Sequence, residues 1–435
     1  MRRVLIAATL LLTTATAHAQ SGLLTAARVK EVKAAIAGAD PLMIACRDQA
    51  VTEATGFLAQ TPNPIKGELK VPGFYTKGQA VQQAITRQLR GDGYAANSLA
   101  VAFALTDRAD FAAKSKEFVF AWVNNLTKPV NGGHFWDFIT LSQRGDTPLV
   151  TYYSFPSFFY AYDILRSKGQ ISSAEHQRFV AWAKPFVDYC SREEIYKNNH
   201  HAWQVVFLAS AGIATGDQSL FDRAMKYYRN GFDYYVAQDG SMWRELLRKE
   251  KAATYSLMAL EAMVQFTHLA EGRGVNLKNL VGKKRTFFST VALRVLSGKI
   301  FSSLPTPKAG GDLRAAVNLL RDFIGDPKTW QAKYGKLVKS ATINGPAAPT
   351  DWGWFFEPCD KWWNDPTYKP LLAGAPYGIT PPRAYTLSYA TLVFRPIGAA
   401  AVGPAPGPAP APAPATPAAG SGGGPGFTSA VGRTP

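Results

Sequence analysis

Apolar residues recur at intervals of three and four along most of this chain, which is the spacing of one face of an α-helix. Short polar or glycine-containing turns, such as residues 106–107, 168–169 and 215–217, separate the periodic stretches. Strict alternation typical of strands is scarce: residues 384–396 come nearest, and they fit a buried helix equally well. The predicted helices span residues 95–106, 111–125, 154–167, 173–190, 202–214, 219–235, 252–271, 284–296 and 311–323.

Helices of roughly 12 to 20 residues joined by short turns are typical of stacked antiparallel helix pairs, so the chain is predicted to be all-α. Such a stack can close into an α/α toroid, which is an incomplete α/α barrel, or it can remain an open solenoid. Periodicity alone does not distinguish the two. No repeat is visible in the letters of the sequence, so any repeat is structural only.

Both ends of the chain differ from the helical body. Residues 1–19 have the basic start, the apolar stretch and the small-x-small site of a secretory signal peptide, although an uncleaved anchor is the alternative. Residues 403–435 are rich in Pro, Ala and Gly and are expected to form a disordered tail. The predicted domain therefore covers residues 20–402, in a periplasmic or secreted protein with no stable membrane insertion.

The formal net charge of +17 lies mostly in the body of the chain and attracts polyanions. Export and the lack of a basic low-complexity run argue against nucleic acid, so the expected partner is an acidic polysaccharide. The histidines outside residues 1–19 show neither H-x-x-x-H nor H-E-x-x-H spacing, so no metal and no organic cofactor is expected. Cys46, Cys190 and Cys359 are compatible with one disulfide and a free thiol, or with three buried thiols.

Two stretches interrupt the helical pattern, at residues 61–78 and 131–153. Both contain cationic and aromatic side chains, which pair with carboxylates and stack on pyranose rings. Ordinary surface loops explain the two stretches equally well. The candidate substrate-binding residues in them are Lys66, Tyr75, His134, Trp136, Arg144 and Tyr152.

Cleavage of a 1,4-linked uronate chain by β-elimination places clear demands on side chains. The carboxylate beside C5 must be neutralised, which amides, imidazolium or guanidinium can do by hydrogen bonding. A base must then remove the C5 proton, and an acid must protonate the departing O4. A tyrosine beside a cation can do both in turn, because the cation lowers the pKa of the phenol.

Side chains of these types occur in two short segments. Asn199 and His200 stand just before a predicted helix, whose N-terminus adds positive potential to a cleft. The alternatives are a helix cap and a solvated histidine. Arg248 and Tyr255 are seven residues apart, so on one helix they would share a face, about 10.5 Å apart along the axis. A solvated arginine and a core tyrosine are the alternative, and Glu245 is expected to be a solvated charge.

Together, the two segments resemble the signature of the alginate lyase family, which contains polysaccharide lyases of the α/α-toroid fold that cut mannuronan-type chains. NNHHAW is similar to the N-N-H-x-x-W segment of that family, and DGSMWRELLR is similar to its D-G-x-x-x-x-E-L-x-R segment, which a tyrosine follows seven residues after the arginine. The matching positions are Asn198, Asn199, His200, Trp203, Asp239, Gly240, Glu245, Leu246, Arg248 and Tyr255. Residues 352–358, with Trp354 and Glu357, resemble a C-terminal segment of the family more loosely.

The resemblance implies that Asn199 and His200 hold and neutralise the substrate carboxylate. It also implies that Tyr255 is the proton shuttle, that Arg248 favours its phenolate, and that residues 61–78 form a mobile lid. The further candidate substrate-binding residues are Asn198, Trp203, Trp354 and Glu357. The sequence departs from the family at Ser256, Lys251 and His201-Ala202, which bears on substrate identity more than on the reaction.

The predicted function is a monomeric lyase for 1,4-linked polyuronate, with alginate or polymannuronate favoured, that leaves 4,5-unsaturated uronate ends. A lyase for glucuronan or another polyuronate and a non-catalytic periplasmic scaffold for a polyanion are the alternatives. A glycoside hydrolase would need two opposed carboxylic acids, such as Glu357 with Asp239 or Glu245, and no sequence feature pairs them.

Overall fold

The computed structural model describes residues 22–130, 145–194, 197–246, 248–282, 308, 310–326, 328–334, 352–374, 377 and 386–398. The predicted signal peptide, the predicted tail and the predicted helix at 284–296 lie outside these residues. Within the described ranges, no helix is both long enough and apolar enough to cross a bilayer.

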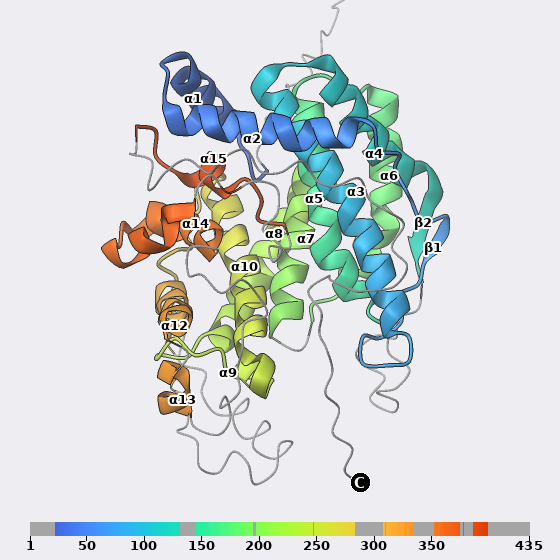
Figure 1. The fold of residues 1–435 in the computed structure, drawn as a ribbon. Helices are drawn as coiled ribbons and strands as arrows, with labels where there is room; N and C mark the ends of the chain where they lie inside the picture. Colours follow the sequence, from blue (N-terminus) through green and yellow to red (C-terminus); the bar gives the residue numbers. More distant parts are fainter. Residues whose placement is uncertain are drawn as a thin grey trace, which may run out of the picture.

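The described chain is built almost entirely from helices (Figure 1). The helices are α1 (Ala26–Ala37), α2 (Pro41–Leu58), α3 (Gln79–Thr106), α4 (Ala109–Asn125), α5 (Thr147–Ser167), α6 (Ser173–Tyr189), α7 (Asn199–Thr215), α8 (Gln218–Tyr235), α9 (Trp243–Leu246), α10 (Ala252–Glu271), α12 (Leu313–Gly325), α13 (Lys328–Tyr334), α14 (Gly353–Trp363) and α15 (Ala390–Phe394). Two short 3₁₀ segments, η2 (Lys249–Lys251) and η6 (Pro366–Gly374), accompany them. Strands β1 (Gly67–Leu69) and β2 (Leu126–Pro129) pair in parallel.

The helices form two layers. Helices α3, α5, α7 and α10 pack against one another in succession, while α4 and α8 pack against the outside of this row. Helices α7 and α10 are buried on nearly every side, as expected for an inner position, because they are apolar all round. Helix α8 instead buries one stripe, including Leu220, Phe221, Ala224 and Tyr228. This arrangement is an α/α toroid, and the predicted all-α class is confirmed.

The observed helices agree with the predicted ranges and often begin earlier. Helix α3 starts at Gln79, well before residue 95. Its first turns are polar and expose much of their surface, so they lack the apolar periodicity on which the prediction depended. Helices α1, α2, α9, α13 and α14 have no counterpart among the predicted ranges. Residues 384–396 were open between strand and helix, and α15 shows that their described part contains a short buried helix.

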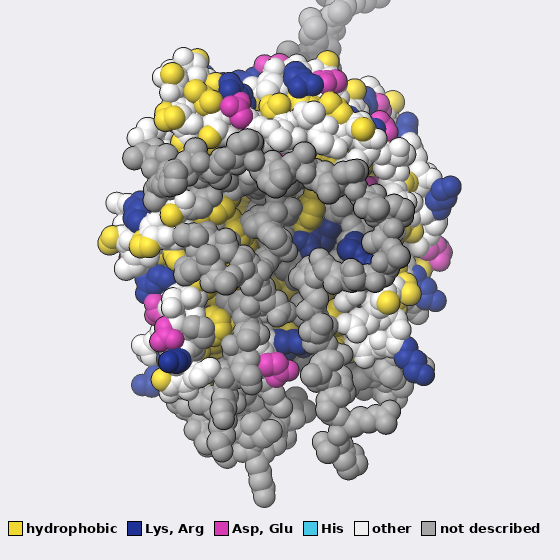
Figure 2. Space-filling view, in the orientation of Figure 1, with side chains coloured by type: hydrophobic (Ala, Val, Ile, Leu, Met, Phe, Trp, Pro, Cys, Tyr) yellow, Lys and Arg dark blue, Asp and Glu magenta, His cyan; other side chains and the backbone are white. Residues whose placement is uncertain are grey.

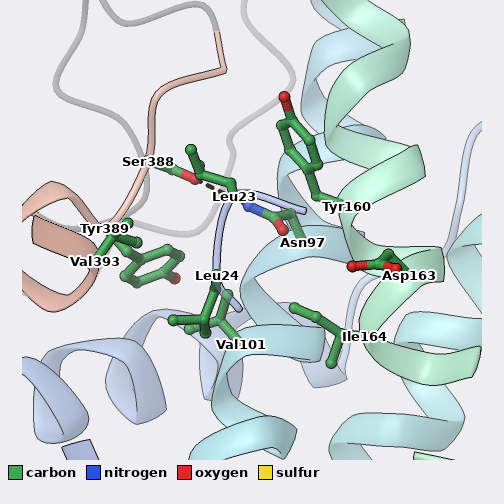
Figure 3. A pocket seen from close by; sticks show the side chains of 10 residues that line it. All are labelled: Leu23, Leu24, Asn97, Val101, Tyr160, Asp163, Ile164, Ser388, Tyr389 and Val393. Atoms are coloured by element: carbon green, nitrogen blue, oxygen red, sulfur yellow. Dashed lines mark hydrogen bonds between the residues drawn. The ribbon is translucent and has the colours of Figure 1, made fainter. Parts of the chain in front are cut away.

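The segment at residues 386–398 joins the C-terminal part of the toroid to its first helices. Figure 1 shows α15 beneath α2, and the two helices are in contact. The Arg28 guanidinium donates to the Leu392 carbonyl oxygen at 2.8 Å, and the Asn97 amide donates to the Ser388 hydroxyl at 2.9 Å. Figure 3 shows the latter contact beside Leu23, which lies in the same pocket. The first described residues and the last therefore close the fold together.

Glu357 lies at the centre of this closure. Both of its carboxylate oxygens accept hydrogen bonds from the Arg395 guanidinium, at 2.7 and 2.6 Å, and the Thr391 hydroxyl adds a third at 2.9 Å. Glu357 and Trp354 are both buried in α14. This arrangement gives no support to the prediction that the two side chains bind substrate: Glu357 holds the C-terminal segment in place, and Trp354 is buried in the same helix.

All three cysteines are buried and free. Cys46 lies in α2, Cys190 ends α6 and Cys359 lies in α14, in three separate parts of the core. Burial raises the pKa of the Cys190 and Cys359 thiols, which keeps them protonated. Of the two possibilities left by the sequence, the structure has the three buried thiols.

Candidate active site

The start of α7 places the amide and imidazole groups of the NNHHAW segment. Asn198 is the residue that caps α7, and its side-chain oxygen accepts a hydrogen bond from the backbone N–H of His200 at 3.0 Å. This is the ordinary capping role of asparagine, so the cap interpretation applies to Asn198. Asn199 and His200 follow as the first two helical residues, where the backbone N–H groups of the helix face outward.

Asn199 is held by a buried carboxylate. Its backbone N–H donates to Glu245 Oε1 at 2.7 Å, and its side-chain Nδ2 lies 3.0 and 3.1 Å from the two Glu245 oxygens. Glu245 is buried in α9, so the prediction of a solvated charge is wrong. Burial raises the pKa of Glu245, against the opposing effect of Arg248 and of the Asn199 hydrogen bonds. Glu245 thus joins the second sequence segment to the first.

Arg248 and Tyr255 do meet, although not in the way that their spacing indicated. Arg248 lies in the turn before η2, and Tyr255 lies in the first turn of α10, so the two residues do not share one helical face. The turn brings the guanidinium carbon of Arg248 to 4.5 Å from the centroid of the Tyr255 ring. A cation over a phenol ring favours the negative charge of a phenolate.

The hydroxyl of Tyr255 meets a second phenol. Tyr75 Oη lies 2.6 Å from Tyr255 Oη, and Lys251 Nζ lies 5.9 Å from the centroid of the Tyr75 ring. Tyr75 is 65% exposed and Tyr255 only 7% exposed, so the outer phenol covers the inner one. The sequence had placed Tyr75 among the substrate-binding residues, and the structure places it at the predicted proton shuttle.

The loop that carries Tyr75 is tied to the start of α5. The backbone N–H of Phe74 donates to Asp146 Oδ2 at 2.7 Å, and the backbone N–H of Val71 donates to the Thr147 hydroxyl at 2.9 Å. Burial raises the pKa of Asp146 to about 6. Asp146 and Thr147 were absent from the sequence prediction, because nothing in the letters pairs them with a loop some 70 residues earlier.

His200 is neutral at pH 7 in this environment. Burial and the nearby Arg248 cation lower its pKa from 6.5 to about 3. A neutral imidazole carries one N–H, so His200 can donate a single hydrogen bond to a bound carboxylate. The dependence of its pKa on Arg248 also places His200 close to the cation that covers Tyr255.

Two aromatic side chains among the candidates have internal roles. The Trp203 indole N–H donates to the Met258 carbonyl oxygen at 2.9 Å and joins α7 to α10. The Tyr152 hydroxyl donates to Glu194 Oε1 at 3.0 Å. Both side chains are buried in the core and bonded within the protein, which gives no support to the prediction that they contact substrate. Their effect on the site is to hold its helices together.

The remaining candidates lie at the edge of the described structure or beyond it. Lys66 is exposed just before β1, where it can meet an anionic chain. His134, Trp136 and Arg144 lie outside the described residues. Figure 2 shows Lys and Arg side chains both around the rim and in the interior of one face of the molecule.

The three carboxylates considered for hydrolysis are engaged in separate places. Glu357 binds Arg395 and Glu245 binds Asn199, while Asp239 Oδ2 accepts a hydrogen bond from the Tyr334 hydroxyl at 3.0 Å. They do not form an opposed pair, so the structure gives the hydrolase alternative no support. Within the described ranges, no cluster of three or more His, Cys, Asp or Glu side chains could hold a metal ion.

Comparison with known sequences identifies relatives of this chain. The alginate lyase family model matches residues 59–297, which is more than half of the chain. An alginate lyase of Pseudomonas syringae pv. syringae (strain B728a) is 26% identical over 141 residues, covering 32% of this chain and 35% of that protein. A polysaccharide lyase of Stenotrophomonas maltophilia (strain K279a) is 23% identical over 275 residues, covering 59% of this chain and 78% of the relative. The chain thus aligns with about a third of the length of the Pseudomonas protein.

Comparison with solved structures agrees in fold. Alginate lyase A1-III from Sphingomonas species A1 is similar with a TM-score of 0.62 at 14% sequence identity, covering 88% of this chain and 98% of that one. An alginate lyase from Bacteroides ovatus gives a TM-score of 0.60 at 14% identity, covering 86% and 99%. These likenesses establish the shared toroid, and the match to the family model establishes the relationship: the chain belongs to the alginate lyase family.

Proposed function

We propose that this protein is a polysaccharide lyase that cleaves 1,4-linked polyuronate, with alginate as the favoured substrate, by β-elimination. The observation that carries the proposal is the Tyr255 hydroxyl, which lies beneath an exposed phenol and beside the Arg248 guanidinium. Relatives named alginate lyase, and the A1-III lyase complexed with a tetrasaccharide, support this choice of substrate.

The substrate carboxylate would bind at the start of α7. Glu245 orients the Asn199 amide, whose Nδ2 lies 3.0 and 3.1 Å from the two Glu245 oxygens, so that the start of α7 is held in one arrangement for the substrate. The neutral His200 ring adds one further donor. Positive charge comes from Arg248 and from the helix N-terminus, which together offset the charge that collects on the carboxylate as C5 loses its proton.

Tyr255 would move the proton. Its phenolate accepts the C5 proton, the C4–O4 bond breaks, and the new hydroxyl donates the proton to the departing O4, leaving a double bond between C4 and C5. In β-mannuronan the proton and the leaving oxygen lie on the same face of the ring, so one side chain can serve both steps. The Arg248 guanidinium over the ring favours the charge of the phenolate.

Tyr75 would act as the lid residue over this centre. Its hydroxyl is within hydrogen-bond distance of the Tyr255 hydroxyl, so it can donate to the phenolate before the sugar arrives. Substrate entry then requires this contact to be exchanged for a contact with the sugar. The exposed Lys66 lies on the same stretch between α2 and α3 and adds positive charge near the anionic chain.

The broader assignments are proposals of the same kind. Residues 20–402 would form the catalytic domain of a monomer. The signal-like residues 1–19 support export to the periplasm or beyond. No organic cofactor is required by this chemistry, because each proton transfer uses a side chain of the chain itself.

The test is incubation of the purified protein with mannuronan, guluronan and glucuronan, followed by ultraviolet absorbance of the unsaturated uronate. We expect the signal to be largest with mannuronan. Tyr255→Phe should lose activity by roughly a thousandfold and still bind mannuronan oligomers, because the ring and Arg248 remain. Reducing ends without the ultraviolet signal would indicate hydrolysis, and full activity of Tyr255→Phe would contradict the shuttle.

A further inference from the structure

His201 stands next to the candidate His200 and contacts Tyr235 of α8. It is 0% exposed in the interior between α7 and α8. Its Nδ1 is hydrogen-bonded to the Tyr235 hydroxyl of α8, and its Nε2 lies 3.1 Å from Glu193 Oε1. Both ring nitrogens are therefore engaged within the protein, which sets His201 apart from a solvated neighbour of His200.

The donor and acceptor roles in this network follow from the charge states. Burial lowers the pKa of His201 to about 4, so the ring is neutral at pH 7. Burial acts to raise the pKa of Glu193, but hydrogen bonds from His201 and Lys197 hold it at about 2. The anionic Glu193 can only accept, so Nε2–H of His201 donates to it and Nδ1 accepts from Tyr235.

Helix α8 has a gap that fits this ring. A Cβ atom on Gly231 would lie 2.6 Å from His201 Cε1 and 2.8 Å from the Tyr235 hydroxyl oxygen. Glycine in the middle of a helix destabilises it by roughly 0.5–1 kcal/mol relative to alanine. The glycine is explained by the space that the imidazole and the phenol occupy.

The network reaches the segment that leads into the site. Glu193 also binds Lys197, and Lys197 Nζ donates to the Glu194 carbonyl oxygen at 2.7 Å. Gln204, one turn further along α7 than His201, accepts from the Glu194 backbone N–H at 2.9 Å. Two side chains of α7, His201 and Gln204, therefore attach the chain before Asn198 to the helix. The contact from His201 through Glu193 extends to Lys197, which precedes the cap residue Asn198.

We propose that His201 is a positioning residue for β-elimination: through Glu193 it fixes the segment before α7 and so sets the orientation of Asn199 and His200 toward the uronate carboxylate. The inference rests on the proposed function. It adds a residue that touches neither the substrate nor Tyr255, and it gives a role to His201, one of the positions at which this sequence departs from the family signature.

Two replacements test the two hydrogen bonds of the His201 imidazole separately. In His201→Gln the amide nitrogen can take the place of Nε2 and keep the contact with Glu193. In His201→Asn the amide oxygen can take the place of Nδ1 and keep only the contact with Tyr235. We expect kcat on mannuronan to fall roughly tenfold in His201→Asn, the kinetic equivalent of one hydrogen bond to a charged group, and to stay within about threefold of wild type in His201→Gln.

A loss of folded protein must be separated from a loss of positioning. Calorimetric titration with a mannuronan oligomer in a Tyr255→Phe background gives the number of binding-competent sites, and kcat is then expressed per competent site. Glu193→Gln, at a half-buried position, tests the same contact if His201→Asn fails to fold. In the double variant of His201→Asn with Glu193→Gln, the loss of kcat should be smaller than the two single losses combined, because both changes remove the His201–Glu193 contact, while Glu193→Gln also weakens the contact with Lys197.

The outcomes are distinct. The rescue by His201→Gln and the lack of additivity would support the positioning role. Equal kcat per site in His201→Asn and wild type, equal losses in the two His201 variants, or additive losses with Glu193→Gln would each overturn it while leaving the lyase assignment intact. Absence of unsaturated product from the wild-type protein with every polyuronate would overturn the proposed function and this inference together.

Discussion

Glu245 and Glu357 are equally buried, yet they lie in two regions with opposite surroundings. Glu357 binds the Arg395 guanidinium through both oxygens and belongs to the closure of the toroid. Glu245 binds the backbone and amide N–H groups of Asn199 and belongs to the candidate active site. One carboxylate is matched by a full opposite charge, and the other is held by neutral donors.

The different surroundings indicate different roles for the two carboxylates. A buried ion pair with matched hydrogen bonds resists rearrangement, and removal of one partner leaves an uncompensated charge. Glu245 accepts the hydrogen bonds of Asn199 in a site that also contains Arg248 and Tyr255, where it can orient groups that must meet a substrate. The closure region should therefore control stability, and the site region should control rate.

The largest expected effect is in the closure region. Glu357→Gln should lower the free energy of unfolding by about 3–5 kcal/mol, because Arg395 would remain buried without its counter-charge. The measurement is denaturant unfolding, with kcat determined on the folded fraction and expected to be unchanged. The double variant Glu357→Leu with Arg395→Met removes both charges and should recover much of the loss. A normal stability of Glu357→Gln would contradict the structural role.

The next effect is in the site region. Glu245→Gln should lower kcat on mannuronan about a hundredfold, because the amide can no longer hold both N–H groups of Asn199 in one orientation. Its stability should change little, since the replacement also removes the cost of burying a charge. Parallel kinetics and thermal unfolding of this variant and of Glu357→Gln give the sharpest form of the comparison. Similar losses of stability in Glu245→Gln and Glu357→Gln would contradict the different roles given to the two carboxylates.

The pH dependence provides a third test. Burial raises the folded-state pKa of Glu245 above the ordinary 4.5, so protonation favours the folded state over the unfolded one. Its contribution to stability is present below 4.5 and is lost as the pH rises through the raised pKa. Activity should change in the opposite sense, because the anion is the form that orients Asn199.

The measurement is the difference between wild type and Glu245→Gln, in both kcat and unfolding free energy, across the acid range. We expect the acid limb of kcat to lie above pH 4.5 in wild type and to be absent in the variant. The subtraction removes the titration of other groups, such as Glu193, whose low pKa gives stability that is lost toward lower pH. An identical acid limb in both proteins would assign it to another group.

The smallest effects come from a matched pair of phenols. Tyr75→Phe removes the hydrogen bond to Tyr255 and should lower kcat/KM by up to about tenfold with no change in stability. Tyr389→Phe removes a 2.6 Å hydrogen bond to the Ser98 hydroxyl in the closure region and should cost about 1 kcal/mol of stability with no change in kcat/KM. If Tyr75→Phe lowered stability and Tyr389→Phe lowered kcat/KM, the assignment of the two regions would be reversed.

The site was partly readable from the sequence. Asn199, His200, Arg248 and Tyr255 fall in two segments whose side-chain types fit the chemistry, and the structure brings these segments together through Glu245 and the Arg248–Tyr255 contact. The predicted shared helical face of Arg248 and Tyr255 is wrong, because a turn and η2 precede α10. The predicted contact still forms because the long Arg248 side chain reaches the Tyr255 ring from that turn.

The order of polar and apolar positions by itself determined the helices, since a face that repeats every three or four residues can be buried only in that form. The residue types in the sequence also determined which side chains can act as hydrogen-bond donors and proton carriers. Only the tertiary structure decided which of them lie together at the candidate site, which are buried elsewhere, as Glu357 and Trp203 are, and that the Tyr75 hydroxyl contacts the Tyr255 hydroxyl. Those outcomes depend on contacts between segments far apart in the chain, and no local pattern records such contacts.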